Sequence, residues 1–592
     1  MSIGTRHFKR TAILFGMVAC AFASLADASV LRISVQHRFG DGPLLLDSLR
    51  YENASGETCS VTRLSYLISG VSVRRADGSW YEVPDSIAWM NAATHRVTMN
   101  VDGVLPDQYQ ALRFRVGLDK VANETDPATR APEHPLNPNV CGLHWAWQGG
   151  YIYMALEGMY RRGNEQPKGY ALHLARDPFL TEVIIEKPVD LRDDAEVQVL
   201  LDVGAILNGP KKMSFEKDGS TTHSKDGDPL AIAMKENLAR AFSVRADPVA
   251  VARAEIVKAK PKPLYMPAKF TPFRFQMAAY FPMPDLPSDN PLIDERVALG
   301  DQLFHETALS LDGTVSCASC HVTGAALSDP RRFSIGIRAQ SGDRNGMALF
   351  NLAWKREFFW DGRAPSLRAQ ALIPIQDPRE MGETLDGVVG KLAVSKDYGT
   401  AFERAFGSSE ITAEKIGLAL ENFLLTLTSH DSKFDLAQRG GEKLSAEEQR
   451  GFELFMTERE PRMGSLGADC FHCHGGPLFT DHQFRNNGLA ITEADLGRSK
   501  VTKASIDRGA FSTPSLRNIA LTAPYMHDGR FATLEEVMDH YSEGVKRTDT
   551  LDPNLAKHPD GGLHLSADDK RALVAFLRAL TDSKFTKGDA QK

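Results

Sequence analysis

Two Cys-x-x-Cys-His motifs stand in the second half of the 592-residue chain: Cys317-Ala-Ser-Cys320-His321 and Cys470-Phe-His-Cys473-His474. Two thiols at this spacing can form thioethers with the vinyl groups of a haem, and the adjacent imidazole can bind its iron. One Cys-x-x-Cys also fits a redox disulfide or half of a zinc site. Two copies with histidine at the same offset favour covalently bound haem c at both places.

The two motifs belong to an internal repeat. Landmarks of the first copy recur in the second in the same order and at nearly the same spacing: Asn351, Trp360-Asp-Gly-Arg363 and Leu367 match Asn518, His527-Asp-Gly-Arg530 and Leu534. Chance rarely produces such agreement. The sequence therefore predicts two related cytochrome domains in tandem.

The repeat also makes the two iron sites unequal. Tyr541 lies 14 residues after His527, whereas the matching position, 14 residues after Trp360, is Pro374. Proline has no ligand atom in its side chain, and an iron without a sixth ligand admits peroxide. We expect an open first haem and a six-coordinate second haem, with Tyr541 or its neighbour His540 as the ligand.

Two more residues near the open position could take part in peroxide chemistry. Peroxide cleavage needs a group that moves a proton between the two oxygens, and Glu380 could do this. By itself, one glutamate is more often a solvated surface charge. Trp360 would by default be core packing, but an indole is easily oxidised and could relay electrons between the haems.

The N-terminus predicts export. A basic start, an apolar run and a small-residue cleavage site follow one another: Arg6 to Arg10, Thr11 to about Leu25, and Ala26-Asp27-Ala28. Acylation at Cys20 is an alternative, for which the preceding Met17 is a poor match. No later segment has the ~18 apolar residues that a membrane span needs. We expect a signal peptide over 1–28 and a periplasmic mature protein without a transmembrane segment.

Composition and the remaining cysteines narrow the class. The net charge of −7 offers no basic excess for phosphates, which argues against nucleic-acid binding. Outside the signal peptide and the haem motifs only Cys59 and Cys141 remain. In an oxidising compartment we expect them to form a disulfide.

The residue pattern and composition divide the mature chain into four parts. Residues 29–245 alternate apolar and polar positions and predict a β-sandwich. A proline-rich linker follows over 246–287. Helical patterns then predict two mostly α-helical cytochrome domains at 288–440 and 441–592; the signals are a helix opened by Pro291, a capping box at Ser445 and apolar spacing over 411–427.

Residues 288–585 resemble the bacterial dihaem cytochrome c peroxidases, most closely the MauG/MbnH branch. The motifs that carry this are Phe359-Trp-Asp-Gly-Arg-Ala364, Pro374 to Met381, Thr513-Pro-Ser-Leu-Arg-Asn518 and Pro524-Tyr-Met-His-Asp-Gly529. In that family the first haem reacts with peroxide and the tryptophan lies between the haems.

The resemblance assigns roles residue by residue. Gln370, Pro374 and Glu380 match the distal-pocket residues of the MauG branch, and Tyr541 matches its tyrosine ligand, where conventional peroxidases carry methionine. That family also binds calcium between the haems, at positions that fall here on Asn345, Thr522 and Pro524. Conventional members often have a removable distal histidine in Ser-Ile-Gly-His. This chain has Ile337 there, which implies a first haem that is open in every redox state.

The N-terminal part resembles the MbnP-type copper-binding proteins, through Gly142-Leu-His-Trp145-Ala-Trp147-Gln-Gly-Gly-Tyr151 and Leu156-Glu-Gly158. In that family a partner dihaem enzyme oxidises a tryptophan to kynurenine, and copper binds nearby. Candidate tryptophans here are Trp145, Trp147 and Trp89. Candidate copper ligands are His144, His95, His37 and His173, with the surroundings of His144 ranked first.

Three functions remain open. The leading expectation is an enzyme that uses hydrogen peroxide to store two oxidising equivalents over both haems and then oxidises a tryptophan, in its own N-terminal domain. The alternative is a conventional cytochrome c peroxidase that takes electrons from a small redox protein. A third is a copper-handling protein whose haems only pass electrons.

Overall fold

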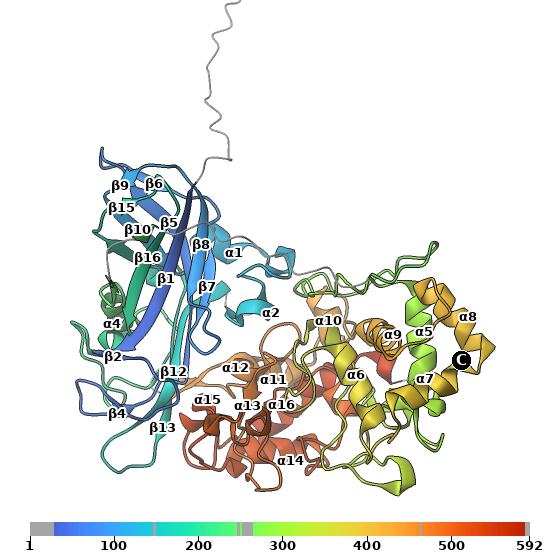
Figure 1. Cartoon of the computed structure of the whole chain (residues 1–592). Helices are drawn as coiled ribbons and strands as arrows, with labels where there is room; N and C mark the ends of the chain where they lie inside the picture. The colour runs from blue at the N-terminus through green and yellow to red at the C-terminus, as the bar shows by residue number, and fades with distance from the viewer. Residues whose placement is uncertain (1–28, 146–149, 246–248, 251–263, 462–463, 587–592) are drawn as a thin grey trace, which may run out of the picture.

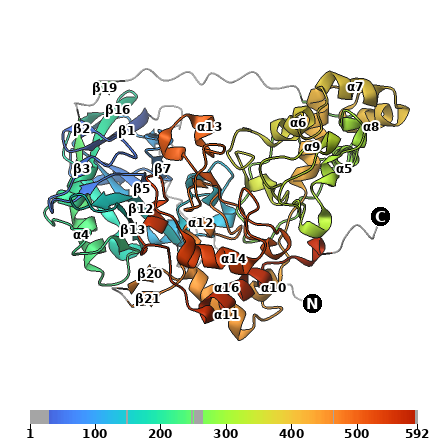
Figure 2. The same cartoon turned by 90° about the horizontal axis from the view of Figure 1, so that it is seen from below.

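The computed structural model describes residues 29–145, 150–245, 249–250, 264–461 and 464–586. The second cytochrome domain, coloured orange to red, lies between the β-rich N-terminal domain and the first cytochrome domain (Figures 1 and 2). The predicted signal peptide and Trp147 fall outside the described residues. This arrangement puts the second haem motif next to the N-terminal domain.

The N-terminal domain is built on two sheets. Within the described residues the first sheet has six strands: β1 (Ser29–Phe39), β2 (Gly42–Pro43), β8 (Thr98–Val104), β16 (Ala195–Asp202), β18 (Phe242–Val244) and β19 (Val249–Ala250). The second has eleven: β3 (Tyr51–Glu52), β4 (Thr58–Cys59), β5 (Arg63–Arg74), β6 (Trp80–Glu82), β7 (Ala88–Asn91), β10 (Ala111–Val116), β11 (His144–Trp145), β12 (Gly150–Arg161), β13 (Lys168–Ala175), β14 (Thr181–Ile185) and β17 (Thr221–Thr222).

The two sheets share one core, as the predicted β-sandwich requires. Alternate residues of β1 are buried, with Leu31 and Ile33 fully inaccessible to solvent, because successive side chains of a strand point to opposite faces. Across the sheets, Phe242 of β18 packs edge-on against Phe114 of β10 at 5.3 Å between ring centroids. Most strand pairs are antiparallel, but β1 pairs with β16 and β13 pairs with β17 in parallel.

Short helices and a small two-stranded ribbon complete this domain. The helices are α1 (Lys120–Glu124), α2 (Pro138–Cys141), α3 (Val203–Asn208) and α4 (Pro229–Leu238), and the ribbon pairs β9 (Gln108–Tyr109) with β15 (Val189–Asp190).

The predicted disulfide between Cys59 and Cys141 is not formed, and both cysteines are buried free thiols. Cys59 pairs with Tyr160 near the end of β12. Cys141 precedes Leu143, whose carbonyl accepts a hydrogen bond from Ile152 near the start of that strand. Eight residues of strand span about 26 Å, and bridged cysteines need Cα atoms within about 7 Å.

The described part of the predicted linker, residues 264–287, contains no helix or strand. It packs on the cytochrome domains. Phe281 is fully buried against Trp354, and the carbonyl of Pro282 accepts a 2.6 Å hydrogen bond from the Trp354 indole. The described part of the proline-rich segment is therefore irregular and packs against the cytochrome domains.

The cytochrome half is helical. The first domain contains α5 (Asp294–Phe304), α6 (Leu367–Gln376), α7 (Leu385–Ala393), α8 (Lys396–Phe406) and α9 (Ala413–Leu425); the second contains α10 (Lys433–Gln438), α11 (Ala446–Met456), α12 (Phe471–His474), α13 (Ser499–Thr502), α14 (Leu534–Asp539), α15 (Pro553–Ala556) and α16 (Ala567–Ala579). Two small ribbons pair β20 (Arg459–Glu460) with β21 (Ser465–Leu466), and β22 (Phe484–Arg485) with β23 (Phe511–Ser512). The capping box predicted at Ser445 begins α11.

The two copies of the repeat fold alike. Asn351 and Asn518 both have left-handed backbones (φ 55°) at the start of a short 3-10 helix. Helix α5 crosses α9, and α11 crosses α16, each at a glycine. A Cβ on Gly300 would lie 2.1 Å from the Ala419 carbonyl oxygen, and one on Gly451 would lie 1.9 Å from that of Ala572. Both crossings therefore need glycine.

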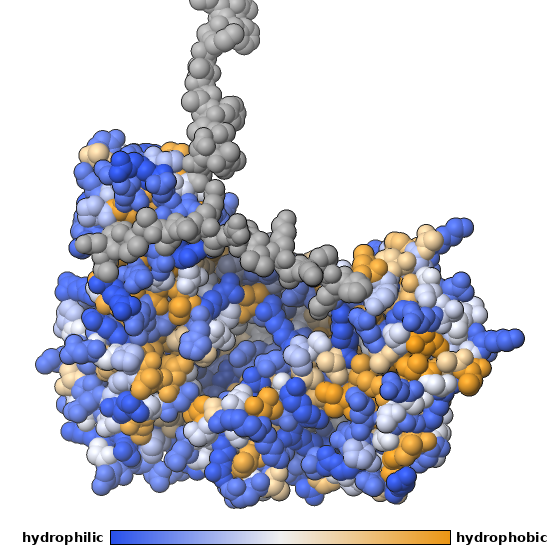
Figure 3. All heavy atoms as spheres, in the orientation of Figure 1, coloured by the Kyte–Doolittle hydropathy of each residue, from blue (hydrophilic) through white to orange (hydrophobic). Residues whose placement is uncertain are grey.

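In the described part of the chain no helix is long and apolar enough to cross a membrane. On the face drawn in Figure 3, hydrophobic residues lie in scattered groups among hydrophilic ones.

The predicted boundary at residue 440 differs from the packing, because α10 belongs to the second domain. Phe434 packs against Phe576 of α16. Next to it, Asp435 and Arg517 form a bidentate ion pair (2.8 and 2.9 Å) between two fully buried side chains. Burial acts against the charged form, but the Arg517 guanidinium lowers the pKa of Asp435 to about 2.

Breaking this ion pair should destabilise the protein. Arg517→Ala leaves a buried carboxylate without its partner, and we expect the free energy of unfolding to fall by about 3–5 kcal/mol. Urea denaturation of the haem-loaded protein measures this. Arg571→Ala, which removes an exposed ion pair with Asp568, is the matched control and should cost less than about 1 kcal/mol. Equal losses in the two variants would contradict the prediction.

Candidate functional site

Both motif histidines are held in the orientation that an iron ligand needs. His321 Nδ1 donates a hydrogen bond to the Leu327 carbonyl (2.9 Å), and His474 Nδ1 donates to the Phe479 carbonyl (3.3 Å). Because a carbonyl only accepts, the proton sits on Nδ1 and Nε2 is left to bind metal. Burial lowers the pKa of both imidazoles, which favours the neutral, ligating form.

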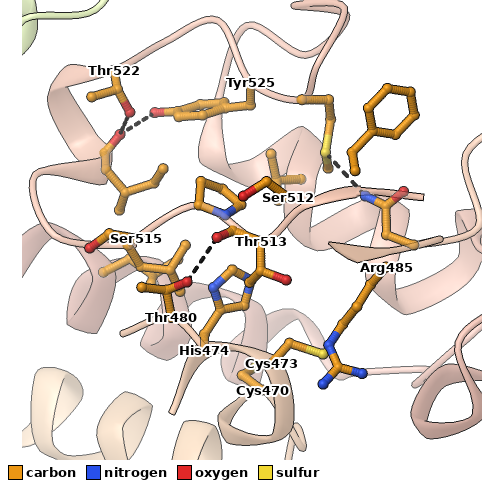
Figure 4. Close-up of a pocket in the computed structure, with 18 of the residues that line it drawn as sticks. Cys470, Cys473, His474, Thr480, Arg485, Ser512, Thr513, Ser515, Thr522 and Tyr525 are labelled. Atoms are coloured by element: carbon orange, nitrogen blue, oxygen red, sulfur yellow. Dashed lines mark hydrogen bonds between the residues drawn. The ribbon is translucent and has the colours of Figure 1, made fainter. Parts of the chain in front are cut away.

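A large, mostly apolar cavity opens at the second motif (Figure 4). Cys470, Cys473 and His474 lie on its wall, and the lining also includes Tyr541, Met538, Leu563 and Leu573. Close to the motif, Thr480 donates a hydrogen bond to the Thr513 carbonyl (2.8 Å). Two thiols, an imidazole and an apolar wall fit a covalently attached haem.

The structure distinguishes the two candidates for the sixth position. Tyr541 lines the cavity, and its hydroxyl lies 3.5 Å from Asn487 Nδ2. His540 Nε2 instead donates to the Asn487 carbonyl (3.0 Å). Both residues belong to a π-helical turn, His540–Gly544, a rare form that is frequent at functional sites. The geometry favours Tyr541.

The distal residues predicted for the first site lie together on α6 and the turn after it. Gln370 and Pro374 are four residues apart on the helix, and hence on one face. The carbonyl of Glu380 accepts a hydrogen bond from Ile337 (2.8 Å), and Ile337 is buried. An apolar side chain therefore stands beside Glu380, at the position of the removable histidine.

Glu380 is also near the first haem motif. Burial, the Cys320 thiol and the Glu380 carboxylate together raise the pKa of Cys317. The pKa of Glu380 is itself raised, first by burial and then by Asp377, while Arg363 opposes the shift. A carboxyl group with a raised pKa is suited to proton transfer near neutral pH.

Trp360 lines the second-haem cavity although it belongs to the first domain. Its indole donates to the Asn345 carbonyl (2.8 Å). The residues predicted to hold calcium (Asn345, Thr522 and Pro524) line the same cavity, so the structure brings all three near Trp360. Their amide, hydroxyl and carbonyl oxygens are the donors that calcium prefers.

The predicted copper ligands His37, His95 and His144 do not come together. His37 bonds the Tyr66 hydroxyl inside the sandwich (2.9 Å). His95 lies in an exposed turn, and His144 packs against the Tyr151 ring. His37 and His144 therefore have local contacts that do not need a metal, and His95 faces solvent.

A different histidine group lies where the N-terminal and second cytochrome domains meet. It consists of His173 of β13, His223 and His472, with one ligand nitrogen from each within 4.8 Å of the others. His472 stands between the two cysteines of the second haem motif. Of these residues only His173 was a candidate from sequence. No local signal marks the other two, because the three histidines come from three segments that are distant in sequence.

Trp145 lies beside this group. Its ring centroid is 5.2 Å from that of His223, 5.8 Å from that of His173 and 6.5 Å from that of Phe471. It is 9% exposed. Trp89, another candidate tryptophan, bonds Ser65 within the sandwich (2.8 Å) and stacks on Arg96. Of these two, Trp145 is the one placed against a haem motif.

Comparison with known proteins agrees with this division of the chain. The family model for di-haem cytochrome c peroxidases matches residues 294–443, and the MbnP model matches residues 28–224. The methylamine utilization protein MauG of Methylorubrum extorquens is 40% identical over 298 residues, covering 50% of this chain and 80% of the relative. Cytochrome c551 peroxidase of Nitrosomonas europaea is 35% identical over 310 residues (52% and 85%).

Among solved structures, a MauG-like protein associated with microbial copper homeostasis is 34% identical, with a TM-score of 0.48 over 54% of this chain and 98% of that one. The MauG and peroxidase relatives are matched over most of their own length, and their region holds both haem motifs, the ordered histidines and the tyrosine-lined cavity. The chain therefore belongs to the di-haem cytochrome c peroxidase family of oxidoreductases, and its residues 28–224 match the MbnP family model.

Proposed function

We propose that this chain uses hydrogen peroxide to oxidise a tryptophan of its own N-terminal domain, and that Trp145 is this tryptophan. The observation that carries the proposal is the packing of Trp145 on Phe471, which lies inside the second haem-attachment motif. When bound, the haems supply the redox chemistry between peroxide and the indole. The chain's own residues position the groups, exclude water and move the proton.

One loop of the first domain serves both haem sites in this proposal. Trp360 reaches the cavity of the second motif. Arg363, three residues later, stacks on the ring of Phe359. Its positive charge acts on the Glu380 carboxylate and opposes the rise in the pKa of that group. Electrons leaving Trp145 would thus pass the second site and reach the first through Trp360. The half-buried Glu380 would move the peroxide proton there, with Gln370 and the side chain of Pro374 closing the pocket.

Two metal roles complete the proposed function. We assign calcium to the oxygen donors of Asn345, Thr522 and Pro524, and copper to the MbnP domain, whose family match suggests it. The predicted export signal supports a periplasmic location for this reaction.

Peptide mass spectrometry tests the central claim. After treatment with hydrogen peroxide, the peptide that contains Trp145 should gain oxygen in the wild type, and the gain should vanish in Trp145→Phe. Trp89→Phe is the control, because Trp89 lies within the sandwich, and it should leave the oxidation unchanged. Unmodified Trp145 in the peroxide-treated wild type would refute the proposal.

The second candidate is a conventional peroxidase, which relatives such as the Nitrosomonas europaea enzyme favour. It predicts fast steady-state reduction of peroxide by reduced cytochrome c, with Trp145 left intact. Measuring both quantities on one preparation separates the two functions.

A further inference from the structure

The three histidines at the domain interface face one another through their ring nitrogens. His173 Nδ1 lies 3.2 Å from His223 Nε2. His223 Nε2 and His472 Nε2 both approach one oxygen of Glu458, at 3.0 and 2.9 Å. Nitrogens bound to one tetrahedral ion at about 2.05 Å lie roughly 3.3 Å apart. The pair His173–His223 has this spacing, and the nitrogen of His472 lies within 4.8 Å of both.

The far nitrogen of His173 is already held as a metal-binding histidine requires. His173 Nε2 lies 2.9 Å from Glu157 Oε1, and Arg63 bonds the same carboxylate oxygen at 2.9 Å. Asn554, from the second cytochrome domain, donates to the other oxygen (3.1 Å). Carboxylate–histidine pairs of this kind fix the tautomer and the ring orientation of metal ligands.

Two buried carboxylates adjoin the group. Glu458 and Asp469 each lie 2.9 Å from His472 Nε2, and the ammonium group of Lys557 bonds both carboxylates (2.8 and 2.7 Å). Buried charges need such partners. The two carboxylates hold the ring of His472 in place, and Glu458, which also lies 3.0 Å from His223 Nε2, offers an oxygen next to the histidine nitrogens.

We propose that His173, His223 and His472 bind one copper ion at the interface of the N-terminal and second cytochrome domains, with Glu458 beside it. The choice of copper rests on the proposed function and on the high affinity of imidazole sites for this ion among divalent first-row metals. The new element is His472. It makes the site a shared one, closed only when the MbnP domain docks on the haem motif.

This sharing ties the metal to the second haem site. His472 is one residue from Cys473 and two from His474, so the ion is joined to the haem-attachment loop through a single turn of chain. Trp145 packs on the same histidines. The tryptophan, the metal and the second haem motif therefore form one continuous contact.

Metal analysis of the full haem-loaded chain tests the proposal. After incubation with copper(II) chloride and removal of excess ion, the wild type should retain one copper per chain. His472→Gln and His173→Gln should each lose at least about 100-fold in affinity, and Glu157→Gln about 10- to 100-fold. His558→Gln is the matched control. It removes a buried imidazole that bonds Asp469 (3.1 Å) but stands outside the three-histidine group, and it should retain copper.

Haem absorbance, measured on each variant, confirms that folding and haem attachment are intact. In the wild type, the electron paramagnetic resonance of bound copper should show coupling to nitrogen. Copper retained by His472→Gln but lost by His173→Gln would overturn the shared site, as would tighter binding of zinc chloride than of copper, or no copper in the wild type. Peptide mass spectrometry of Trp145 on the same samples keeps the two ideas separate. If copper is bound but Trp145 is unmodified, the proposed function is wrong and the copper site is still supported.

Discussion

Glu380→Gln is expected to slow the reaction of the protein with hydrogen peroxide by about 100- to 10,000-fold, the range that general acid–base groups contribute. Glutamine keeps the size of the side chain but cannot accept the peroxide proton. Stopped-flow absorbance of the haems after mixing with peroxide measures the rate. Haem content and the unfolding midpoint should match the wild type, because no hydrogen bond to the Glu380 carboxylate is seen in the described residues.

The pH profile gives this prediction a second readout. Burial raises the pKa of Glu380 above its usual 4.5. A base must be deprotonated to act, so the wild-type rate should fall as the pH drops through this raised value, and the fall should be absent in Glu380→Gln.

The control is Asp343→Asn, which removes a nearby exposed charge that helps to raise the pKa of Glu380. It should move the acid limb to lower pH without changing the rate above it. A Glu380→Gln rate within about twofold of the wild type would show that Glu380 does not move the proton.

Sequence reasoning succeeded where the information is local or repeated. Each of the local signals lies within a dozen residues of sequence. The capping box at Ser445 begins helix α11, and the alternating residues of β1 form a strand with one buried face. The haem motifs are equally local. The repeat added register. The match of Pro374 with Tyr541 predicted a ligand at Tyr541 or His540, and in the structure Tyr541 lines the cavity that His474 also lines.

The same reasoning failed where partners meet only through tertiary structure. The interface histidines are brought together from β13, from a loop and from a haem motif, and taken alone each resembles an ordinary buried residue. His144 drew attention by its neighbours in sequence, yet its ring packs on Tyr151. Cys59 and Cys141 were paired because no other cysteines remained, and such elimination says nothing about the distance between them. In the structure they lie near opposite ends of β12.

The choice between His540 and Tyr541 shows the limit most clearly, because the two are adjacent. An offset in a repeat cannot separate neighbours when the backbone is a π-helix, whose wider turn changes which side chains share a face. In the structure that turn directs Tyr541 to the cavity and His540 to the Asn487 carbonyl. Substitutions of Tyr541 and His540 should therefore have different effects on the second haem.

Tyr541→Phe should convert the second haem from six-coordinate to five-coordinate and abolish the oxidation of Trp145. Removing the hydroxyl takes away the proposed sixth ligand, an oxygen donor, while the ring continues to fill the cavity wall. Electron paramagnetic resonance of the ferric protein should change from one high-spin haem to two.

His540→Gln is the matched control, since glutamine can still donate to the Asn487 carbonyl, and it should leave the spectrum as in the wild type. A changed spectrum in His540→Gln with an unchanged one in Tyr541→Phe would make His540 the ligand. A low-spin second haem that persists in both variants would mean that neither side chain binds it. Because the two substitutions are adjacent in one buried turn, a general loosening of that turn would affect both, whereas loss of a ligand affects only one.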